Sequence, residues 1–229
     1  MIVEIGHLSL TVSTNGHQSN ILESMGYDRE FASGLVPNPP NKRSLMDGWS
    51  ESHTLHLYRR EGSVPIEIVK YPHTASGSSR YMLQSGPGEY FENPEYFGPS
   101  QYITDVGPMD TVAVTTPSPR VTRSFFQTLG FEEISPHQLE FRSPMSGSSI
   151  FLELVENGQS GGEPTLDRVG FSSLGLITTD ILTELSRLEE AGYSVTSIET
   201  IDLPDAVMDV AFVTEPTGTP VELIGFHGV

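Results

Sequence analysis

The stretch AFVTEPTGTPVELIGF, residues 211–226, contains two short apolar strands joined by a turn at Thr217-Gly218. Its second strand carries Glu222 between Val221 and Leu223. A carboxylate that leaves water for an apolar interior loses several kcal/mol of solvation unless it finds a partner. The position of Glu222 therefore raises the question of what this side chain contacts.

Two other apolar strands contain a glutamate in the same way. Glu67 lies in PIEIVKY, residues 65–71, and Glu153 lies in SIFLELVEN, residues 149–157. One explanation is that one face of each strand is wet, so that each carboxylate is simply solvated. Three occurrences at one structural position favour a shared role instead. We expect the three carboxylates to line the interior of curled sheets.

The surroundings of these strands repeat along the chain. Each copy reads as a strand, a helix that ends at a glycine followed by an aromatic residue, and then two or three antiparallel strands. The three glycine–aromatic steps are Gly26-Tyr27, Gly130-Phe131 and Gly192-Tyr193. The pattern predicts an α+β fold of three βαβββ modules that form curled mixed sheets.

The repeats also suggest how the chain is divided. Residues 1–72 form the first module, and residues 109–229 form two further modules. Between them, residues 73–108 are rich in Gly, Ser, Pro and Tyr and are too short for another module. We interpret them as a structured linker or a flap.

Composition excludes several classes of function. The chain has 229 residues, no cysteine and a formal net charge of −18. Such an acidic protein is a poor partner for nucleic acid or for an anionic membrane surface. Without cysteine, a metal could be held only by His, Asp, Glu or other oxygen donors.

The sequence contains no apolar run long enough to cross a membrane. The amino terminus, MIVEIGHLSL, lacks a basic segment and reads directly as a strand rather than a signal peptide. We therefore expect a cytoplasmic protein.

The repeat resembles the vicinal oxygen chelate superfamily, which includes glyoxalase I, extradiol dioxygenases and bleomycin-binding proteins. The motifs that carry the resemblance are GHLSLTV with LESMGY and PIEIVKYP, TVAVTT with SFFQTLGF and FLELVE, and SSLGLITTD with LEEAGY and FVTEPTGTPVELIGF. The resemblance implies a glyoxalase-like fold. In it, two paired modules form a cup, and metal ligands come from the first and last strands of each module.

The family pattern maps onto six positions of this chain. The last-strand positions all carry glutamate, whereas only the first of the three first-strand positions carries histidine. The last-strand residues are Glu67, Glu153 and Glu222, and the first-strand residues are His7, Thr111 and Ser173. A cup formed by the second and third modules, which we expect to pair, would therefore lack histidine, and it would either have lost its metal or bind a ligand directly.

The resemblance implies His7 and Glu67 as metal ligands, and Glu153 and Glu222 as catalytic residues that act as ligand or base. An imidazole with carboxylates suits a divalent ion such as Zn, Fe, Mn, Ni or Co. His56 is a further candidate ligand, or more simply a polar member of an amphipathic strand.

Three modules leave one without a partner, and two arrangements are open. Two copies of the first module could meet across a homodimer axis, or the first module could pair within the chain and leave another module over. We expect a homodimer.

The expected function is a metal-dependent enzyme, of lyase, isomerase or dioxygenase type, that acts on a small oxygen-chelating substrate. The alternative is a metal-free protein that binds a small molecule without chemistry. The loop 34–50 contains Lys42, Arg43 and the single tryptophan, Trp49. It is either a cover for an anionic or aromatic ligand or an ordinary surface loop.

Overall fold

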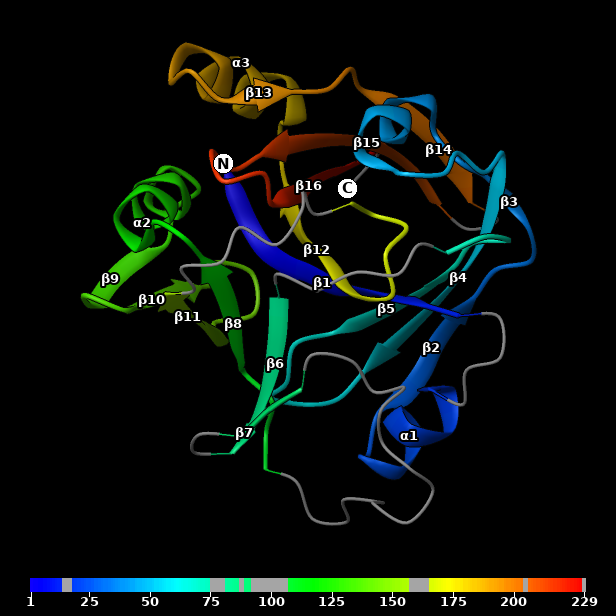
Figure 1. Ribbon diagram of the computed structural model, residues 1–229, viewed down its shortest axis with the longest axis horizontal. Coiled ribbons are helices and arrows are strands. Elements are labelled where there is room, and N and C mark those ends of the chain that lie inside the picture. Colours follow the sequence, from blue (N-terminus) through cyan, green and yellow to red (C-terminus); the bar gives the residue numbers. More distant parts are fainter. Residues whose placement is uncertain are drawn as a thin grey trace.

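The computed structural model describes residues 1–13, 18–74, 81–86, 89–91, 107–156, 165–203 and 206–227. Within these ranges the chain is mostly β-strand, with three α-helices and one short 3₁₀-helix (Figure 1). The α+β class and the curled mixed sheets expected from the sequence are confirmed.

The first and third repeats each contain one helix and several strands. The first consists of β1 (Ile2–Val12), α1 (Gln18–Ser24), β2 (Asp28–Ala32), β3 (Val36–Pro37), the 3₁₀-helix η1 (Pro40–Leu45), β4 (Ser52–Arg59) and β5 (Ile66–Lys70). The third consists of β12 (Gly170–Thr178), α3 (Ile181–Glu190), β13 (Ser194–Val195), β14 (Glu199–Leu203), β15 (Ala206–Thr214) and β16 (Pro220–Phe226).

The second repeat forms a separate sheet together with two strands from the segment before it. Its elements are β8 (Thr111–Thr116), α2 (Pro119–Thr128), β9 (Glu132–Ser135), β10 (Gln138–Arg142) and β11 (Ser149–Glu156). The added strands are β6 (Tyr81–Gly86) and β7 (Glu89–Phe91). The segment 73–108 thus contributes strands, although residues 75–80, 87–88 and 92–106 of it lie outside the described ranges.

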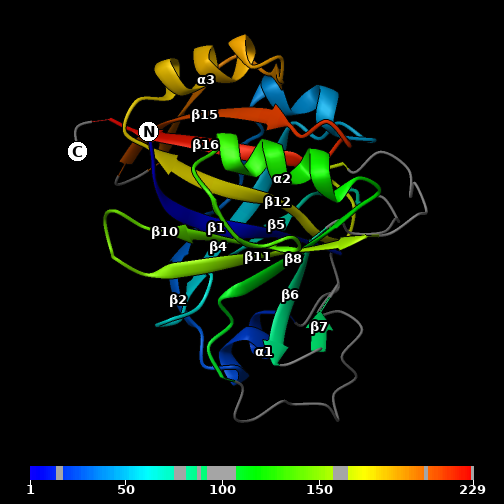
Figure 2. The ribbon, with the colours of Figure 1, turned by 90° about the vertical axis from the view of Figure 1, so that its left-hand side faces the viewer.

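The strand pairing differs from the pairing expected from the sequence. The large sheet has the order β13-β15-β16-β12-β1-β5-β4-β2, so antiparallel pairing of β1 with β12 joins the first repeat to the third. The second repeat does not pair with the third, because the edge of β8 is occupied by β6. The backbone groups along this side of β8 are already paired with β6, so they are not free to bind another strand. Figures 1 and 2 show β1 and β12 side by side at the centre of the molecule.

The register within each repeat is the same. The last strand runs parallel to the first, and its glutamate lies opposite Ser9 in the first repeat, Ala113 in the second and Gly175 in the third. His7, Thr111 and Ser173 each precede those positions by two residues. Since side chains alternate along a strand, each of these residues shares a sheet face with its glutamate.

The glycine–aromatic steps end the three helices as the sequence predicts. Gly26, Gly130 and Gly192 have φ angles of 83°, 97° and 87°, a conformation that glycine adopts without steric cost. Tyr27 and Phe131, which follow two of these glycines, are buried. The glycine therefore turns the chain so that the next side chain enters the core.

The smaller sheet is anchored to the larger one by buried polar contacts. The Thr122 hydroxyl of α2 donates to the Glu215 carboxylate at 2.7 Å, and the Tyr81 hydroxyl of β6 donates to the Pro220 carbonyl at 3.1 Å. Both acceptors lie at the β15–β16 turn, and one hydrophobic core extends across both sheets. The turn at Thr217-Gly218, between β15 and β16, thus joins the two sheets.

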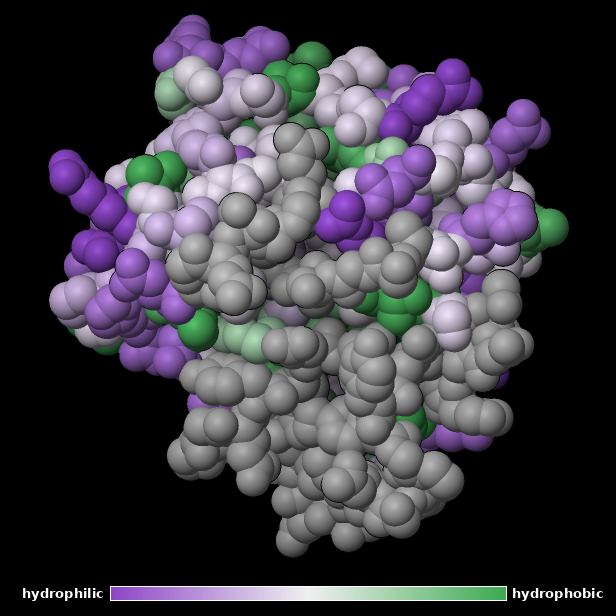
Figure 3. Space-filling model, viewed as in Figure 1, coloured by the Kyte–Doolittle hydropathy of each residue, from purple (hydrophilic) through white to green (hydrophobic). Residues whose placement is uncertain are grey.

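Among the residues that are coloured in Figure 3, most are hydrophilic, and the hydrophobic ones lie in small separate groups. This agrees with the strongly acidic composition. None of the helices in the described ranges has both the length and the apolar character that a membrane span requires.

Candidate metal centre

Three side chains that are far apart in the sequence meet in the large sheet. The His7 Nε2 atom lies 3.0 Å from a carboxylate oxygen of Glu222 and 3.4 Å from one of Glu67. One ligand atom from each residue lies within 4.8 Å of the other two. The structure thus brings Glu222 to the predicted pair of His7 and Glu67.

The order of strands explains this convergence. On one side β1 pairs with β5, which carries Glu67, and on the other side it pairs with β12, which pairs in turn with β16 and Glu222. His7 therefore lies between two last strands that come from different repeats. The Ser9 hydroxyl donates to the Glu67 carboxylate at 3.3 Å and helps to orient it.

His7 and Glu222 lie close together in a buried environment, so the charge of each side chain strongly affects the pKa of the other. His7 and Glu222 are 7% and 6% exposed. Burial alone would lower the pKa of His7, but the carboxylates of Glu67 and Glu222 raise it above the ordinary value. Burial alone would raise the pKa of Glu222, whereas the hydrogen bond to His7 and the charge of Lys42 lower it. Both acid and base are therefore stabilised in their charged forms when no metal is bound.

A glycine opposite His7 makes room for its imidazole ring. Gly175 is the residue that pairs with His7 across the β1–β12 ladder. A Cβ atom at position 175 would lie 2.7 Å from the His7 ring. The ring therefore lies directly over the β12 backbone, and only glycine allows it to stay there. A glycine inside a strand is the sequence signal for such a close approach.

The arrangement fits a divalent metal ion. Donor atoms that bind one ion at ordinary bond lengths lie about 3 Å apart, which matches the two separations from His7 Nε2. One imidazole and two carboxylates suit the ions named above. The fourth family position is Ser173, which is buried and carries only a hydroxyl. Three strong protein donors leave coordination positions for a substrate.

The three residues line a cavity of about 180 Å³. Its remaining walls are mainly apolar and come from both the first and the third repeat. They include Phe31, Leu55, Leu57, Ile177, Ile201, Leu203, Met208, Ile224 and Phe226, together with Lys42, His53 and Arg59. A cavity of this size accepts a small organic molecule and keeps bulk water away from its polar end.

Glu153 and Thr111 are in a different place. They lie on β11 and β8 of the smaller sheet, and neither lines this cavity. The structure therefore does not bring Glu153, predicted as a catalytic residue, to His7. The reason is the strand pairing, because β11, which carries Glu153, lies in the smaller sheet, whereas β1, which carries His7, lies in the larger one.

One residue of the cavity was not identified from the sequence. This residue, His53, is almost fully buried in the cavity wall. His56, the candidate further ligand, is not among the residues that line the cavity. His53 lies on the same face of β4 as Leu55 and Leu57, because side chains alternate along a strand. This alternation is the sequence signal that could have identified His53. Lys42 is also buried in the cavity wall.

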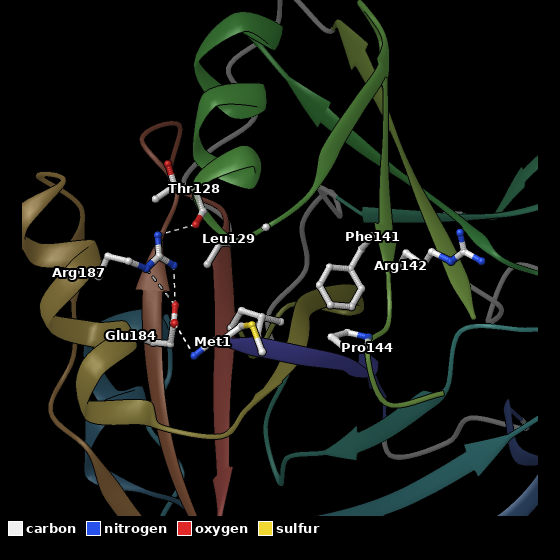
Figure 4. Close-up of a pocket in the computed structure, with 10 residues that line it drawn as sticks. Met1, Thr128, Leu129, Phe141, Arg142, Pro144, Glu184 and Arg187 are labelled. Atoms are coloured by element: carbon white, nitrogen blue, oxygen red, sulfur yellow. Dashed lines mark hydrogen bonds and ion pairs between the residues drawn. The ribbon is translucent and has the colours of Figure 1, made fainter. Parts of the chain in front are cut away.

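A second cavity, of about 330 Å³, lies between α2, α3 and the amino terminus (Figure 4). Glu184 lies 2.6 Å from the Met1 amino group and accepts hydrogen bonds from Arg187, which also donates to the Thr128 carbonyl. Burial alone would raise the pKa of Glu184, but Arg187 and the amino terminus lower it. The polar groups of this cavity satisfy one another, so it resembles a structural junction.

Comparison with known proteins supports the fold. Two solved variants of glyoxalase I from Zea mays are each 12% identical to this chain, with TM-scores of 0.56 and 0.55. Each alignment covers 97% of this chain, and 92% and 93% of the respective glyoxalase chain. A glyoxalase family protein from Enterococcus faecalis, at 22% identity and a TM-score of 0.39, covers 50% of this chain and 94% of its own.

No family model matches the sequence, and no curated protein matches it. The likeness to the glyoxalase I structures extends over nearly the whole chain, whereas its sequence identity is low. It therefore establishes the fold: this chain has a glyoxalase-like fold, consistent with the superfamily that its repeats resemble.

The space above Gly175 can be tested by filling it. We expect Gly175→Ala to displace the His7 ring and to weaken zinc binding by about ten- to a hundredfold, the range for residues that orient a metal ligand. Gly34→Ala is the control, because nothing lies within 4 Å of a Cβ atom at that position. Isothermal titration calorimetry on the folded variants measures both affinities. Equal zinc affinity for Gly175→Ala and wild type would contradict the placement of His7.

The ion pair in the second cavity predicts a pH-dependent contribution to stability. Because the pKa of Glu184 is lowered by folding, its contribution is complete above the unfolded pKa and is lost as the pH falls through the folded pKa. We expect Glu184→Gln to lower the free energy of unfolding by about 1 kcal/mol at pH 7, since Arg187 is partly exposed.

Urea unfolding of wild type and Glu184→Gln at several pH values measures this difference. The two curves should converge in acid, while the exposed control Glu189→Gln should match wild type throughout. A difference that persists unchanged in acid would show that Glu184 acts through packing rather than through its charge.

Proposed function

We propose that this protein is a metal-dependent enzyme that acts on a small organic molecule with two neighbouring oxygen atoms. The observation that carries this proposal is the convergence of His7, Glu67 and Glu222 in a cavity. The likeness to glyoxalase I in fold supports it, as does the family position of each of these residues.

Each residue has a distinct task in the proposed site. His7 would hold the ion through Nε2, with its ring fixed over Gly175, and Glu67 would hold it through a carboxylate oriented by Ser9. A bound divalent ion would supply Lewis-acid stabilisation to a negatively charged substrate oxygen. The apolar walls would exclude water and fix the orientation of the substrate.

We assign two tasks to Glu222, which would hold the ion through one carboxylate oxygen and transfer a proton through the other. Its carboxylate is buried beside His7, and its only hydrogen-bond partner among the described residues is that histidine. It would remove or return a proton at a substrate carbon next to the metal-bound oxygens. This role favours lyase or isomerase chemistry over a reaction with dioxygen.

Metal-free binding of a small molecule is the second candidate function. The mainly apolar lining of the cavity and the hydroxyl of Ser173 at the fourth ligand position favour it. The two functions make different predictions about metal affinity.

Metal titration tests the proposed site directly. We expect wild type to bind one zinc, nickel or manganese ion per chain, and His7→Ala, Glu67→Gln and Glu222→Gln each to weaken binding by at least about tenfold because each removes a ligand. Glu153→Gln is the matched control, since it removes the equivalent glutamate of the smaller sheet and should leave affinity unchanged. Calorimetry after removal of bound metal with a chelator gives the affinities.

Loss of affinity in Glu153→Gln alone, or no metal binding by wild type, would contradict the proposed metal centre. In the second case, a small molecule that raises the melting temperature in the presence of chelator would favour the metal-free function.

Proton transfer can be followed without knowing the natural substrate. Pyruvate carries two neighbouring oxygens and exchangeable methyl protons. We expect the metal-loaded protein to accelerate exchange of these protons with D2O. Chelator should abolish the acceleration, and so should Glu222→Gln at a metal concentration that saturates the variant. Nuclear magnetic resonance of the methyl signal measures the rate. Full acceleration by Glu222→Gln, or its loss in Glu153→Gln, would contradict the assigned role of Glu222.

A further inference from the structure

We propose that Lys42 binds an anionic group of the substrate, so that the molecule accepted by this cavity is a small carboxylate with neighbouring oxygens. This inference rests on the proposed metal-dependent function and adds the charge of the substrate to it. Lys42 lines the same cavity as His7, Glu67 and Glu222, but it comes from η1 rather than from a strand of the sheet.

The loop that carries Lys42 is fixed against the third repeat. The Asn41 side-chain amide donates to the carbonyls of Ser197 and Val210, both at 2.9 Å. Further along, Asp167 accepts from the backbone amides of Asp47 and Gly48 at 2.9 and 2.7 Å. The loop 34–50 is therefore not a loose surface loop. It presents Lys42 to the cavity and holds this residue in place.

Lys42 is a buried residue whose ammonium group has no ion-pair partner within 4.0 Å among the described residues. The residue is 6% exposed, and its Nζ atom lies 5.6 Å from the centre of the Phe212 ring. Among the described residues, none forms an ion pair with this ammonium within 4.0 Å or accepts a hydrogen bond from it. Lysine is almost never buried without a partner, so such a residue in a cavity wall indicates a ligand that is absent here.

Charge balance shows when that ligand is needed. The carboxylates of Glu67 and Glu222 share the cavity with the ammonium group of Lys42. A divalent ion requires neutral His7 and is itself balanced by the two carboxylates. The charge of Lys42 is then uncompensated in a buried cavity, and an anion that enters with the substrate restores the balance.

A neighbouring side chain is suited to the same ligand. His53 is 1% exposed, lines the cavity, and has a buried Nδ1 atom without a hydrogen-bond partner among the described residues. Burial, followed by the charge of Lys42, lowers the pKa of His53 to about 3, so the ring is neutral near pH 7. It offers a polar contact beside Lys42 without adding charge.

The other basic residues provide a contrast. Arg59, which also lines the cavity, forms an ion pair with Glu30. Arg43, the next residue in the loop, is exposed and lies over Trp49, with 4.7 Å between its guanidinium carbon and the ring. Lys70, the only other lysine in the chain, lies at the end of β5 and does not line the cavity. Lys70 is therefore a control with the same chemistry in a different place.

The test compares two probes of nearly identical shape on the zinc-loaded protein. Glycolate and glycolamide both present two neighbouring oxygens, but only glycolate is an anion. We expect wild type to bind glycolate at least about tenfold more tightly than glycolamide, the range for a hydrogen bond to a charged group. At zinc concentrations that saturate each protein, Lys42→Met should remove this preference, and Lys70→Met should leave the preference unchanged.

Lysine labelled with ¹³C at Cε provides a second readout, because the chain has only two lysines. Glycolate should shift the Lys42 signal and leave the Lys70 signal in place. An unchanged preference in a folded, zinc-binding Lys42→Met variant would overturn the inference and leave the metal centre standing. Absence of zinc binding by wild type, measured first, would overturn both.

Discussion

The candidate site depends on one set of backbone hydrogen bonds, the antiparallel ladder between β1 and β12. This ladder makes the first and third repeats into a single sheet and sets His7 opposite Gly175. It also places β5 and β16 at equivalent distances on the two sides, with Glu67 and Glu222 facing the same space. A shift of one residue would turn His7 away from both carboxylates, because side chains alternate between faces.

The same ladder creates an electrostatic problem that a metal and an anionic ligand would solve. Two carboxylates, two imidazoles, an ammonium and a guanidinium line one small cavity whose other walls are mainly apolar. Buried charges persist in proteins only when they are paired or coordinate an ion. His7 and the carboxylates pair with one another, whereas Lys42 faces the cavity without an ion-pair partner within 4.0 Å among the described residues. An arrangement of this kind is a feature of binding sites more than of stable cores.

Much of the fold and half of the site could be predicted from the sequence. The glycine–aromatic steps and the glutamates recur with a constant register, so the three repeats and the positions of His7, Glu67 and Glu222 were accessible. The pairing of repeats was not, because it depends on β6 occupying the edge of β8, and β6 lies in a segment with no clear strand pattern. Glu153 was grouped with the others for that reason. His53 was missed as a cavity residue because burial of a polar side chain depends on tertiary contacts. For the same reason, the sequence left open whether the loop with Lys42 covers a ligand or lies on the surface.

The central claim is that one divalent ion binds where β1, β5 and β16 present their polar side chains. Anomalous X-ray diffraction from crystals soaked in zinc, recorded on both sides of the zinc absorption edge, tests this claim most directly. The account predicts a single strong peak within bonding distance of His7 Nε2 and of a carboxylate oxygen from both Glu67 and Glu222. A zinc peak elsewhere, with His7 still hydrogen-bonded between two metal-free carboxylates, would contradict it.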